Sequence, residues 1–303
     1  MPHTTAETAP HARLVPLASG YAALNGIQLY YEIYGQGEPL VLLPGGLMTI
    51  GDMGTLLEPL ARTHTVIAVE LQGHGRTADT DRPLSFATMA DDIAALLHQL
   101  TIPQADIVGL SLGAAVGLRT AIQHPEQVHR LVVISHPYAK RGWYPEAQEG
   151  MAHVSAAMAD AMMHTAAGQY AKNWPEPQRF PQFLDKMGTM MGASYDWSAE
   201  VTHLPMPVLL AFADNDSVSQ HHIAEFFALL GGGVKEPGWQ NTRLSRARLA
   251  IVPGYSHYNV VSASELAPII DTCLADPLTD SSTGTTVTSQ AASERTTSPE
   301  TQA

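Results

Sequence analysis

The sequence predicts an α/β protein in which helices cover both faces of a mostly parallel sheet. Short runs rich in Val, Ile and Leu alternate with longer amphipathic segments, the pattern that buried parallel strands and their crossover helices produce. At 303 residues and 45% hydrophobic content, the chain is long and apolar enough to bury one large core. We therefore expect one α/β core made of residues 14–136 and 206–276, interrupted by a helical segment.

An eight-stranded sheet and four helices are expected in this core. The strands are short apolar runs at 21–25, 27–34, 39–43, 65–70, 105–110, 130–135, 207–213 and 248–252. Helical patterns cover 86–100, 112–123, 220–230 and 264–275. Ser85 precedes the first helix and suits an N-cap, because its hydroxyl can accept a hydrogen bond from a free backbone N–H. Pro125 follows the second helix closely and fits its end.

The alternation stops between the sixth and seventh strands, at residues 137–205, which we call the cap segment. Helical stretches here are rich in Met, Trp and Tyr, and no further Val/Ile strand follows. Methionine is flexible and fills irregular gaps, so this composition suits helix packing, an apolar wall over a site, or both. We expect a helical cap inserted after the sixth strand.

Both ends of the chain are polar and carry no hydrophobic pattern. Residues 1–13 and 277–303 cannot bury enough apolar surface to offset the entropy of ordering, which predicts two disordered tails. No signal peptide and no run of membrane-spanning length is recognisable, so a cytoplasmic protein without a membrane span is expected. The single cysteine, Cys273, excludes an internal disulfide and lies in an apolar helical pattern, which favours a buried, inert thiol.

The net charge of the chain limits the classes of molecule that it is expected to bind. A net charge of −13 and an isoelectric point near 5.4 disfavour binding to nucleic acid and repel acidic substrates. His221 and His222 are adjacent and lack the i, i+4 spacing that would place two metal ligands on one helix face. We therefore expect a small neutral substrate, with neither a metal nor an organic cofactor. The sequence leaves the oligomeric state open.

The pentapeptide Gly109-Leu110-Ser111-Leu112-Gly113 follows an apolar strand and opens an Ala/Leu-rich helix. A serine on so sharp a strand-to-helix turn is held out in the open, and small residues on either side let the backbone turn tightly. The geometry suits a nucleophile, and we predict Ser111 in that role.

A serine hydroxyl needs a base, and the base needs a carboxylate to orient it. His257 follows a buried-looking strand and a Gly-containing loop, from which it could reach a serine at a strand end; the alternative is a surface histidine. Asp214 and Asp216 both follow the strand at 207–213. We favour Asp216, which lies on the loop proper, whereas Asp214 could instead hold the turn by local hydrogen bonds.

Backbone N–H donors must meet the oxyanion that forms on the substrate. The residue after the nucleophile, Leu112, lies at a helix N-terminus and provides the first donor. The second is expected in the loop that follows the third strand, where we choose Gly46 over Leu47. A glycine pair in such a loop is also ordinary turn chemistry.

Together these residues resemble the α/β-hydrolase fold superfamily over about residues 21–275. The chain order Ser111, Asp216, His257 is that family's order. Ester-type hydrolysis is the leading class that the resemblance implies. Enol-lactonases, C–C bond hydrolases and cofactor-free haloperoxidases or perhydrolases share the triad, and some relatives are non-catalytic receptors. A serine at the nucleophile turn argues against haloalkane dehalogenases and epoxide hydrolases, which use aspartate there.

The segment Glu70-Leu71-Gln72-Gly73-His74-Gly75-Arg76-Thr77 also looks like the family's Asp-x-x-Gly-His-Gly-x-Ser segment. Glu70 and Thr77 replace the usual Asp and Ser, a conservative change with a structural role expected. Pro44 stands where many relatives have histidine before the oxyanion glycine.

We thus expect a serine hydrolase acting on an apolar carboxylic ester or lactone through an acyl-enzyme. His136 follows the sixth strand and could face the site, although a structural histidine is the more common outcome. The candidate substrate contacts are Leu47, His136, Tyr138, Met158, Met162 and Trp174.

Overall fold

The computed structural model describes residues 14–240 and 244–276 and contains one eight-stranded sheet. The strands are β1 (Ala18–Leu24), β2 (Ile27–Tyr34), β3 (Glu38–Leu43), β4 (His64–Glu70), β5 (Ala105–Leu110), β6 (Val128–Ile134), β7 (Val208–Asn215) and β8 (Ala247–Ser256). Their order in the sheet is β1-β2-β4-β3-β5-β6-β7-β8. The pairs β1–β2 and β2–β4 are antiparallel and all later pairs are parallel, so the predicted fold class is confirmed.

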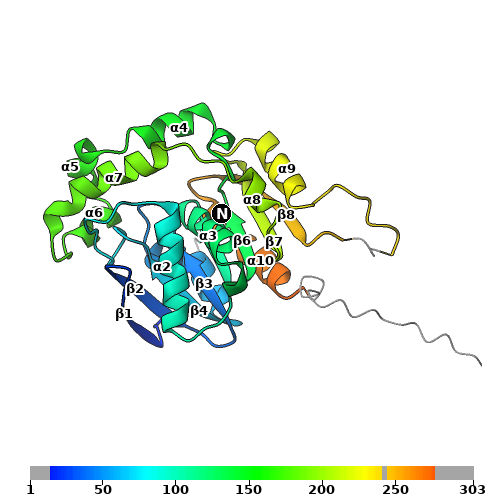
Figure 1. Cartoon of the computed structure of the whole chain (residues 1–303), viewed down its shortest axis with the longest axis horizontal. Coiled ribbons are helices and arrows are strands. Elements are labelled where there is room, and N and C mark those ends of the chain that lie inside the picture. Colours follow the sequence, from blue (N-terminus) through cyan, green and yellow to red (C-terminus); the bar gives the residue numbers. More distant parts are fainter. Residues whose placement is uncertain (1–13, 241–243, 277–303) are drawn as a thin grey trace, which may run out of the picture.

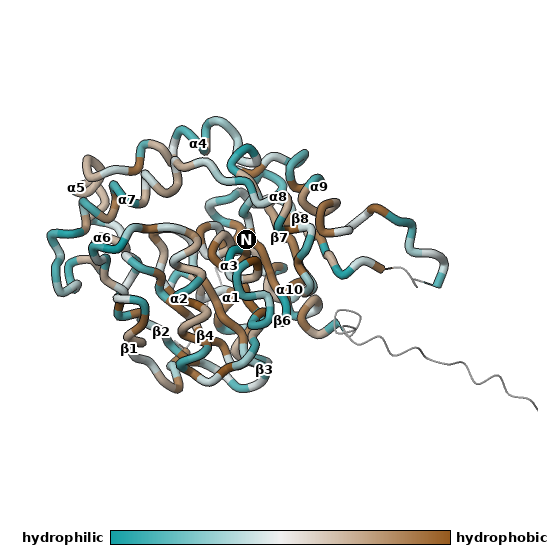
Figure 2. The backbone as a smooth tube through the Cα atoms, viewed as in Figure 1, coloured by the Kyte–Doolittle hydropathy of each residue, from teal (hydrophilic) through white to brown (hydrophobic). Residues whose placement is uncertain are grey.

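Helices lie on both faces of this sheet (Figure 1). The core helices are α1 (Gly54–Leu60), α2 (Phe86–Gln99), α3 (Leu112–Gln123), α9 (Gln220–Leu229) and α10 (Leu266–Leu274). Alternate strand residues point to opposite faces: Val41 and Leu43 of β3 join the apolar layer under α2, α3 and α9, while Leu40 and Leu42 join the layer under α1 and α10. Figure 2 shows hydrophobic residues concentrated along the central strands.

The predicted elements are all present, with small shifts at their ends. The Ser85 hydroxyl accepts a hydrogen bond from Thr88 N at 3.0 Å, as expected of an N-cap. Helix α1 was not expected, because it is short and contains Pro59. Strand β8 continues through Pro253 and Gly254, where a loop was expected. It lies at the sheet edge, where a proline without an N–H is tolerated, and Asn215 pairs with Ser256 beyond a register shift.

The cap segment carries five α-helices and lies at the carboxyl end of the sheet (Figure 1). They are α4 (Pro145–Ala152), α5 (Ala159–Met162), α6 (Ala166–Ala171), α7 (Phe180–Gly192) and α8 (Ser198–Val201). Aromatic side chains anchor it to the core: Trp174 donates a hydrogen bond to Gly75 O at 2.9 Å, and Phe183 packs edge-on against His74.

Three further expectations concern the two tails, membrane-spanning helices and the single cysteine. Both predicted tails, 1–13 and 277–303, lie outside the described residues. Within the described ranges no helix is long and apolar enough to cross a membrane. Cys273 is buried in α10, and burial raises the pKa of its thiol, which keeps it protonated as expected of an inert cysteine.

Candidate active site

Ser111 lies on the sharp turn between β5 and α3 with φ 50° and ψ −111°, a conformation that L-residues rarely adopt. The turn is held by the Ser111 N–H, which donates to Ile134 O at 2.8 Å. A Cβ at Gly109 would collide with the backbone of Gly113, and one at Gly113 with the backbone of Leu43. The two glycines are therefore required for the helix and strand to approach so closely.

Three side chains from different strand ends form one hydrogen-bonded row. Ser111 Oγ lies 3.1 Å from Nε2 of His257, the first residue after β8. His257 Nδ1 lies 3.1 Å from Asp216 Oδ1, just beyond β7. Because β5, β6, β7 and β8 are parallel neighbours, these distant segments meet at the carboxyl ends of the strands.

The Asp216 carboxylate is buried, and each of its two oxygens has two hydrogen-bond partners. Ser135 Oγ donates to Oδ2 at 2.5 Å, the Ala213 N–H donates to the same oxygen at 3.2 Å, and the Val218 N–H donates to Oδ1 at 3.2 Å. Burial disfavours the charged form, but hydrogen bonds and charge attraction from His257, with help from Ser135 and Ala213, outweigh it. The pKa of Asp216 therefore lies below its ordinary value, and the group is a carboxylate at neutral pH.

The second aspartate has different contacts. Asp214 is exposed, and its Oδ1 accepts hydrogen bonds at 2.9 Å from Asn215 Nδ2 and from the Gly254 N–H. It thus ties the end of β7 to β8, whereas Asp216 contacts the histidine.

Two backbone segments meet beside Ser111. Leu112 opens the 12-residue helix α3, whose first N–H groups have no partner within the helix. A Cβ at Gly46 would lie 3.7 Å from Leu112 Cβ, so the loop after β3 runs directly alongside. The next residue, Leu47, has φ 61°, which turns the chain sharply at this point.

A cavity of about 340 Å³ opens over Ser111 and His257. Its walls combine the core with α4, α7 and the end of the cap segment. The lining residues are Gly46, Leu47, Phe86, Ser111, Leu112, His136, Trp143, Ala147, Gly150, Met151, Val154, Met187, Met191, Tyr195, Ser217, His257 and Tyr258. The lining is mainly apolar and aromatic, and it contains neither Lys nor Arg.

The structure brings two of the six candidate substrate contacts, Leu47 and His136, to this cavity. Tyr138 is fully buried instead and stacks on His222 at 4.1 Å. Met158 is exposed on the outside, Met162 is half-buried against the core, and Trp174 packs inside the cap segment against Phe183. Their sequence positions did not reveal which way each side chain would point.

Two residues at the site were not singled out from the sequence. Phe86 lines the cavity, and Ser135 donates a hydrogen bond to the Asp216 carboxylate. Trp143, Tyr195 and Met191 also line the cavity and come from the Met- and aromatic-rich cap segment. Ser135 has φ 56° at the end of β6, and its place between a buried strand and His136 is the one sequence signal that could have marked it.

The segment from Glu70 to Thr77 has structural contacts. Glu70 is fully buried and forms an ion pair with Arg76 at 2.7 Å, while the Thr77 hydroxyl donates to Glu70 O at 2.6 Å. The longer side chain of glutamate, relative to aspartate, fits because Gly75 has no Cβ in the space that the carboxylate occupies.

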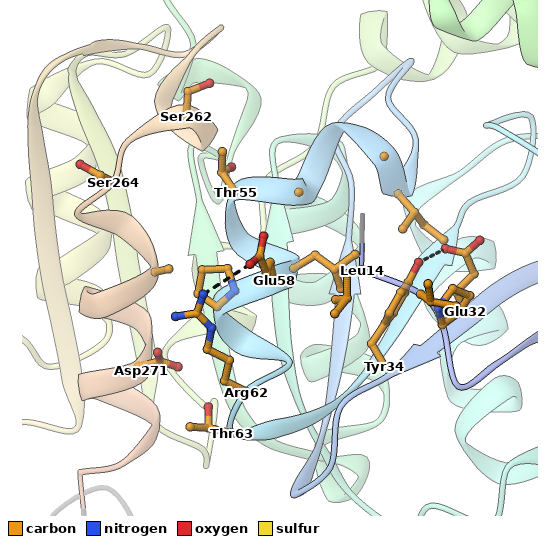
Figure 3. A pocket seen from close by; sticks show the side chains of 18 of the residues that line it. Leu14, Glu32, Tyr34, Thr55, Glu58, Arg62, Thr63, Ser262, Ser264 and Asp271 are labelled. Atoms are coloured by element: carbon orange, nitrogen blue, oxygen red, sulfur yellow. Dashed lines mark hydrogen bonds and ion pairs between the residues drawn. The ribbon is translucent and has the colours of Figure 1, made fainter. Parts of the chain in front are cut away.

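A larger hollow of about 1070 Å³ lies elsewhere, between α1, α10 and β2 (Figure 3). Tyr34, Glu58, Arg62 and Asp271 are among its lining residues, and no member of the row from Ser111 to Asp216 reaches it. We therefore assign the reactive site to the smaller cavity. In the described part of the chain, no cluster of three or more His, Cys, Asp or Glu side chains could hold a metal ion.

Known proteins share this architecture. A family model described as alpha/beta hydrolase fold matches residues 38–162. Serine hydrolase BPHL of Homo sapiens is 32% identical over 123 residues, which is 39% of this chain and 42% of that protein, so the chain spans less than half of this relative.

Two solved structures are similar over most of the chain. The enol-lactonase from Burkholderia xenovorans superimposes with a TM-score of 0.62 at 20% identity, covering 84% of this chain and 100% of the other. The carboxylesterase CesB from Bacillus subtilis gives a TM-score of 0.65 at 17% identity, covering 85% and 91%. With the observed strand order, these similarities show that the chain has the α/β-hydrolase fold.

Proposed function

We propose that the protein is a serine hydrolase that cleaves a neutral, apolar carboxylic ester or lactone through an acyl-enzyme. The observation that carries the proposal is the row of hydrogen bonds from Ser111 Oγ through His257 to Asp216, with 3.1 Å at both steps. The row lies in an apolar cavity and starts from a serine held in a strained turn. A nucleophile, a base and an orienting carboxylate in this geometry are what acyl transfer requires.

The first half of the reaction acylates the serine. Ser111 Oγ bonds to the substrate carbonyl carbon while its proton passes to His257 Nε2. The carbonyl oxygen becomes an oxyanion, which the N–H groups of Leu112 and Gly46 stabilise by about 3 kcal/mol per donor. The carbon–oxygen bond to the leaving group then breaks, and His257 returns its proton to the departing alkoxide.

The second half releases the acid. Water loses a proton to His257 and attacks the acyl carbon. As the second tetrahedral intermediate collapses, His257 returns that proton to Ser111 Oγ and the carboxylic acid leaves. Asp216 stays ionised throughout, because its hydrogen bonds hold its pKa low, and it stabilises the imidazolium that forms twice per turnover.

The lining of the cavity supports a neutral, apolar substrate. Methionine and aromatic side chains surround Ser111, and no cationic side chain is present to bind a carboxylate or phosphate. The similar folds of an enol-lactonase and a carboxylesterase, together with a serine hydrolase among the relatives, agree with this substrate class.

Hydrolysis of short and medium 4-nitrophenyl esters tests the proposal. We expect turnover by the wild type and its loss in Ser111→Ala at unchanged melting temperature. Saturable binding of these esters without turnover would instead favour a receptor that kept the pocket.

A further inference from the structure

His136 lies in the wall of the reactive cavity, within a group of aromatic side chains. Its ring stacks on Tyr195 with 5.8 Å between centroids and an interplanar angle of 11°, and it meets the edge of Trp143 at 5.4 Å. Trp143 in turn packs edge-on against the ring of His257 at 5.3 Å. The imidazole is thus fixed in orientation close to the reactive row, yet it takes no part in it.

A chain of hydrogen bonds sets the tautomer of this imidazole. Trp143 Nε1, which can only donate, lies 3.0 Å from the hydroxyl oxygen of Tyr195. That hydroxyl lies 3.2 Å from His136 Nε2. Because the Tyr195 oxygen already accepts from Trp143, its own proton is free to be donated to His136 Nε2. A neutral imidazole that accepts at Nε2 carries its proton on Nδ1.

The imidazole is neutral at the pH at which a histidine base works. Burial disfavours its charged form, and the neighbouring His257 and His222 add to the effect, so the pKa of His136 is lowered to about 3. The ring is 3% exposed and carries one N–H donor over the whole physiological range.

Nδ1 of His136 has no hydrogen-bond partner among the residues that the structure describes. A buried donor left without a partner is unfavourable, and a suitable acceptor would recover that cost. His136 is one of the residues that line the cavity, and its Nδ1 is itself buried, so an acceptor reaches it when the neighbouring side chains shift as the substrate binds. We propose that the His136 Nδ1–H binds an oxygen atom of the substrate other than the scissile carbonyl, making the protein selective for esters or lactones with a second carbonyl or ether oxygen.

The acceptor is an uncharged oxygen. The cavity lining contains no Lys or Arg, so a carboxylate brought to His136 would lose its hydration in exchange for one neutral donor. The net charge of −13 adds repulsion at long range. A keto, ether or amide oxygen suffers neither penalty. This inference rests on the proposed hydrolysis at Ser111 and specifies its substrate.

Matched esters provide the test. We would compare 4-nitrophenyl hexanoate with its 4-oxo and 5-oxo analogues, dividing each ratio of kcat/KM by the ratio of hydroxide-catalysed rates to remove intrinsic reactivity. An apolar wall alone would disfavour the more hydrated oxo esters. With the donor at His136, we expect at least one oxo ester to be preferred about tenfold, since that factor corresponds to roughly 1.4 kcal/mol, within the range of one hydrogen bond.

Two variants distinguish the roles of the two ring nitrogens of His136. The amide nitrogen of His136→Asn can occupy the position of Nδ1, whereas that of His136→Gln reaches the position of Nε2 and leaves Nδ1 empty. We expect the asparagine variant to keep most of the preference for the oxo ester and the glutamine variant to lose it. The ratio is measured within each variant, so a general loss of activity does not affect it.

The tautomer is read independently from long-range ¹⁵N–¹H spectra of the full-length, ¹⁵N-labelled protein, where we expect His136 protonated at Nδ1. A proton on Nε2, equal rates for plain and oxo esters in the wild type, or a preference kept by the glutamine variant alone would each overturn the inference while hydrolysis at Ser111 stood. Absence of any ester turnover would instead remove the proposed function and this inference with it.

Discussion

The hydroxyl of Ser135 donates a 2.5 Å hydrogen bond to Oδ2 of Asp216, joining the ends of the neighbouring strands β6 and β7. Both residues are buried, and Ser135 takes a left-handed conformation to make the contact. Because Oδ1 of the same carboxylate faces His257, the bond fixes the carboxylate plane from the opposite side. Ser135 is thus a positioning residue for the proposed triad.

Ser135→Ala should reveal this role through its dependence on pH. The hydroxyl stabilises the ionised form of Asp216 and helps to hold its pKa low. Its contribution to the free energy of unfolding is therefore present at neutral pH and lost as the pH falls through the folded pKa. We expect the variant to lose roughly 1.5–3 kcal/mol at pH 7 and progressively less as the pH falls below the ordinary pKa of aspartate, measured by urea unfolding at a series of pH values.

The pH profile of kcat/KM tests the same variant. Without the hydroxyl, the carboxylate that orients His257 is held less firmly, so kcat/KM on the plateau should fall by about tenfold, or roughly 1.4 kcal/mol. The exposed Ser264→Ala serves as the control. An unchanged plateau, with stability falling equally at every pH, would show that Ser135 only packs.

Substitution of the two aspartates at the end of β7, Asp214 and Asp216, should have different effects. Asp216→Asn should lower kcat by about four orders of magnitude, because an amide stabilises the wrong tautomer of His257. It should also lower the melting temperature, because the amide NH2 replaces an oxygen that accepts from buried donors. Asp214→Asn should leave kcat nearly unchanged and affect stability alone, since its carboxylate holds a turn. Steady-state kinetics and thermal unfolding of both variants check this, and the reverse pattern would contradict the assignment.

The methionines on α7 and in the cavity should control the preference for substrate length. Each substrate methylene buried against them contributes about 0.8 kcal/mol until the cavity is full. Met191 lines the cavity, whereas Met158 lies exposed on the outside of the cap segment. Met191→Ala should reduce kcat/KM for hexanoate esters several-fold more than for acetate esters, and Met158→Ala should not. A dependence on length that is flat in the wild type would mean that the methionines only pack.

The sequence predicted the sheet because buried parallel strands appear as local apolar runs. It singled out Ser111, His257 and Asp216, whose side chains the structure brings together, because turns at strand ends have local signals. It did not indicate which side chains outside the strands would face the cavity. Tyr138 and Trp174 looked like substrate contacts, yet both pack into the core, while Phe86 from α2 lines the cavity. The contact between Ser135 and Asp216 joins residues 81 positions apart and leaves no pattern in either segment.

The most direct test of the central claim is the reaction of the purified protein with a fluorophosphonate probe, followed by identification of the labelled peptide. Only a serine activated by a base and an oxyanion site reacts quickly with such a probe. We predict labelling of one residue, Ser111, and none in the folded Ser111→Ala variant. Labelling of that variant at the rate of the wild type would contradict the claim, because the nucleophile would then lie elsewhere.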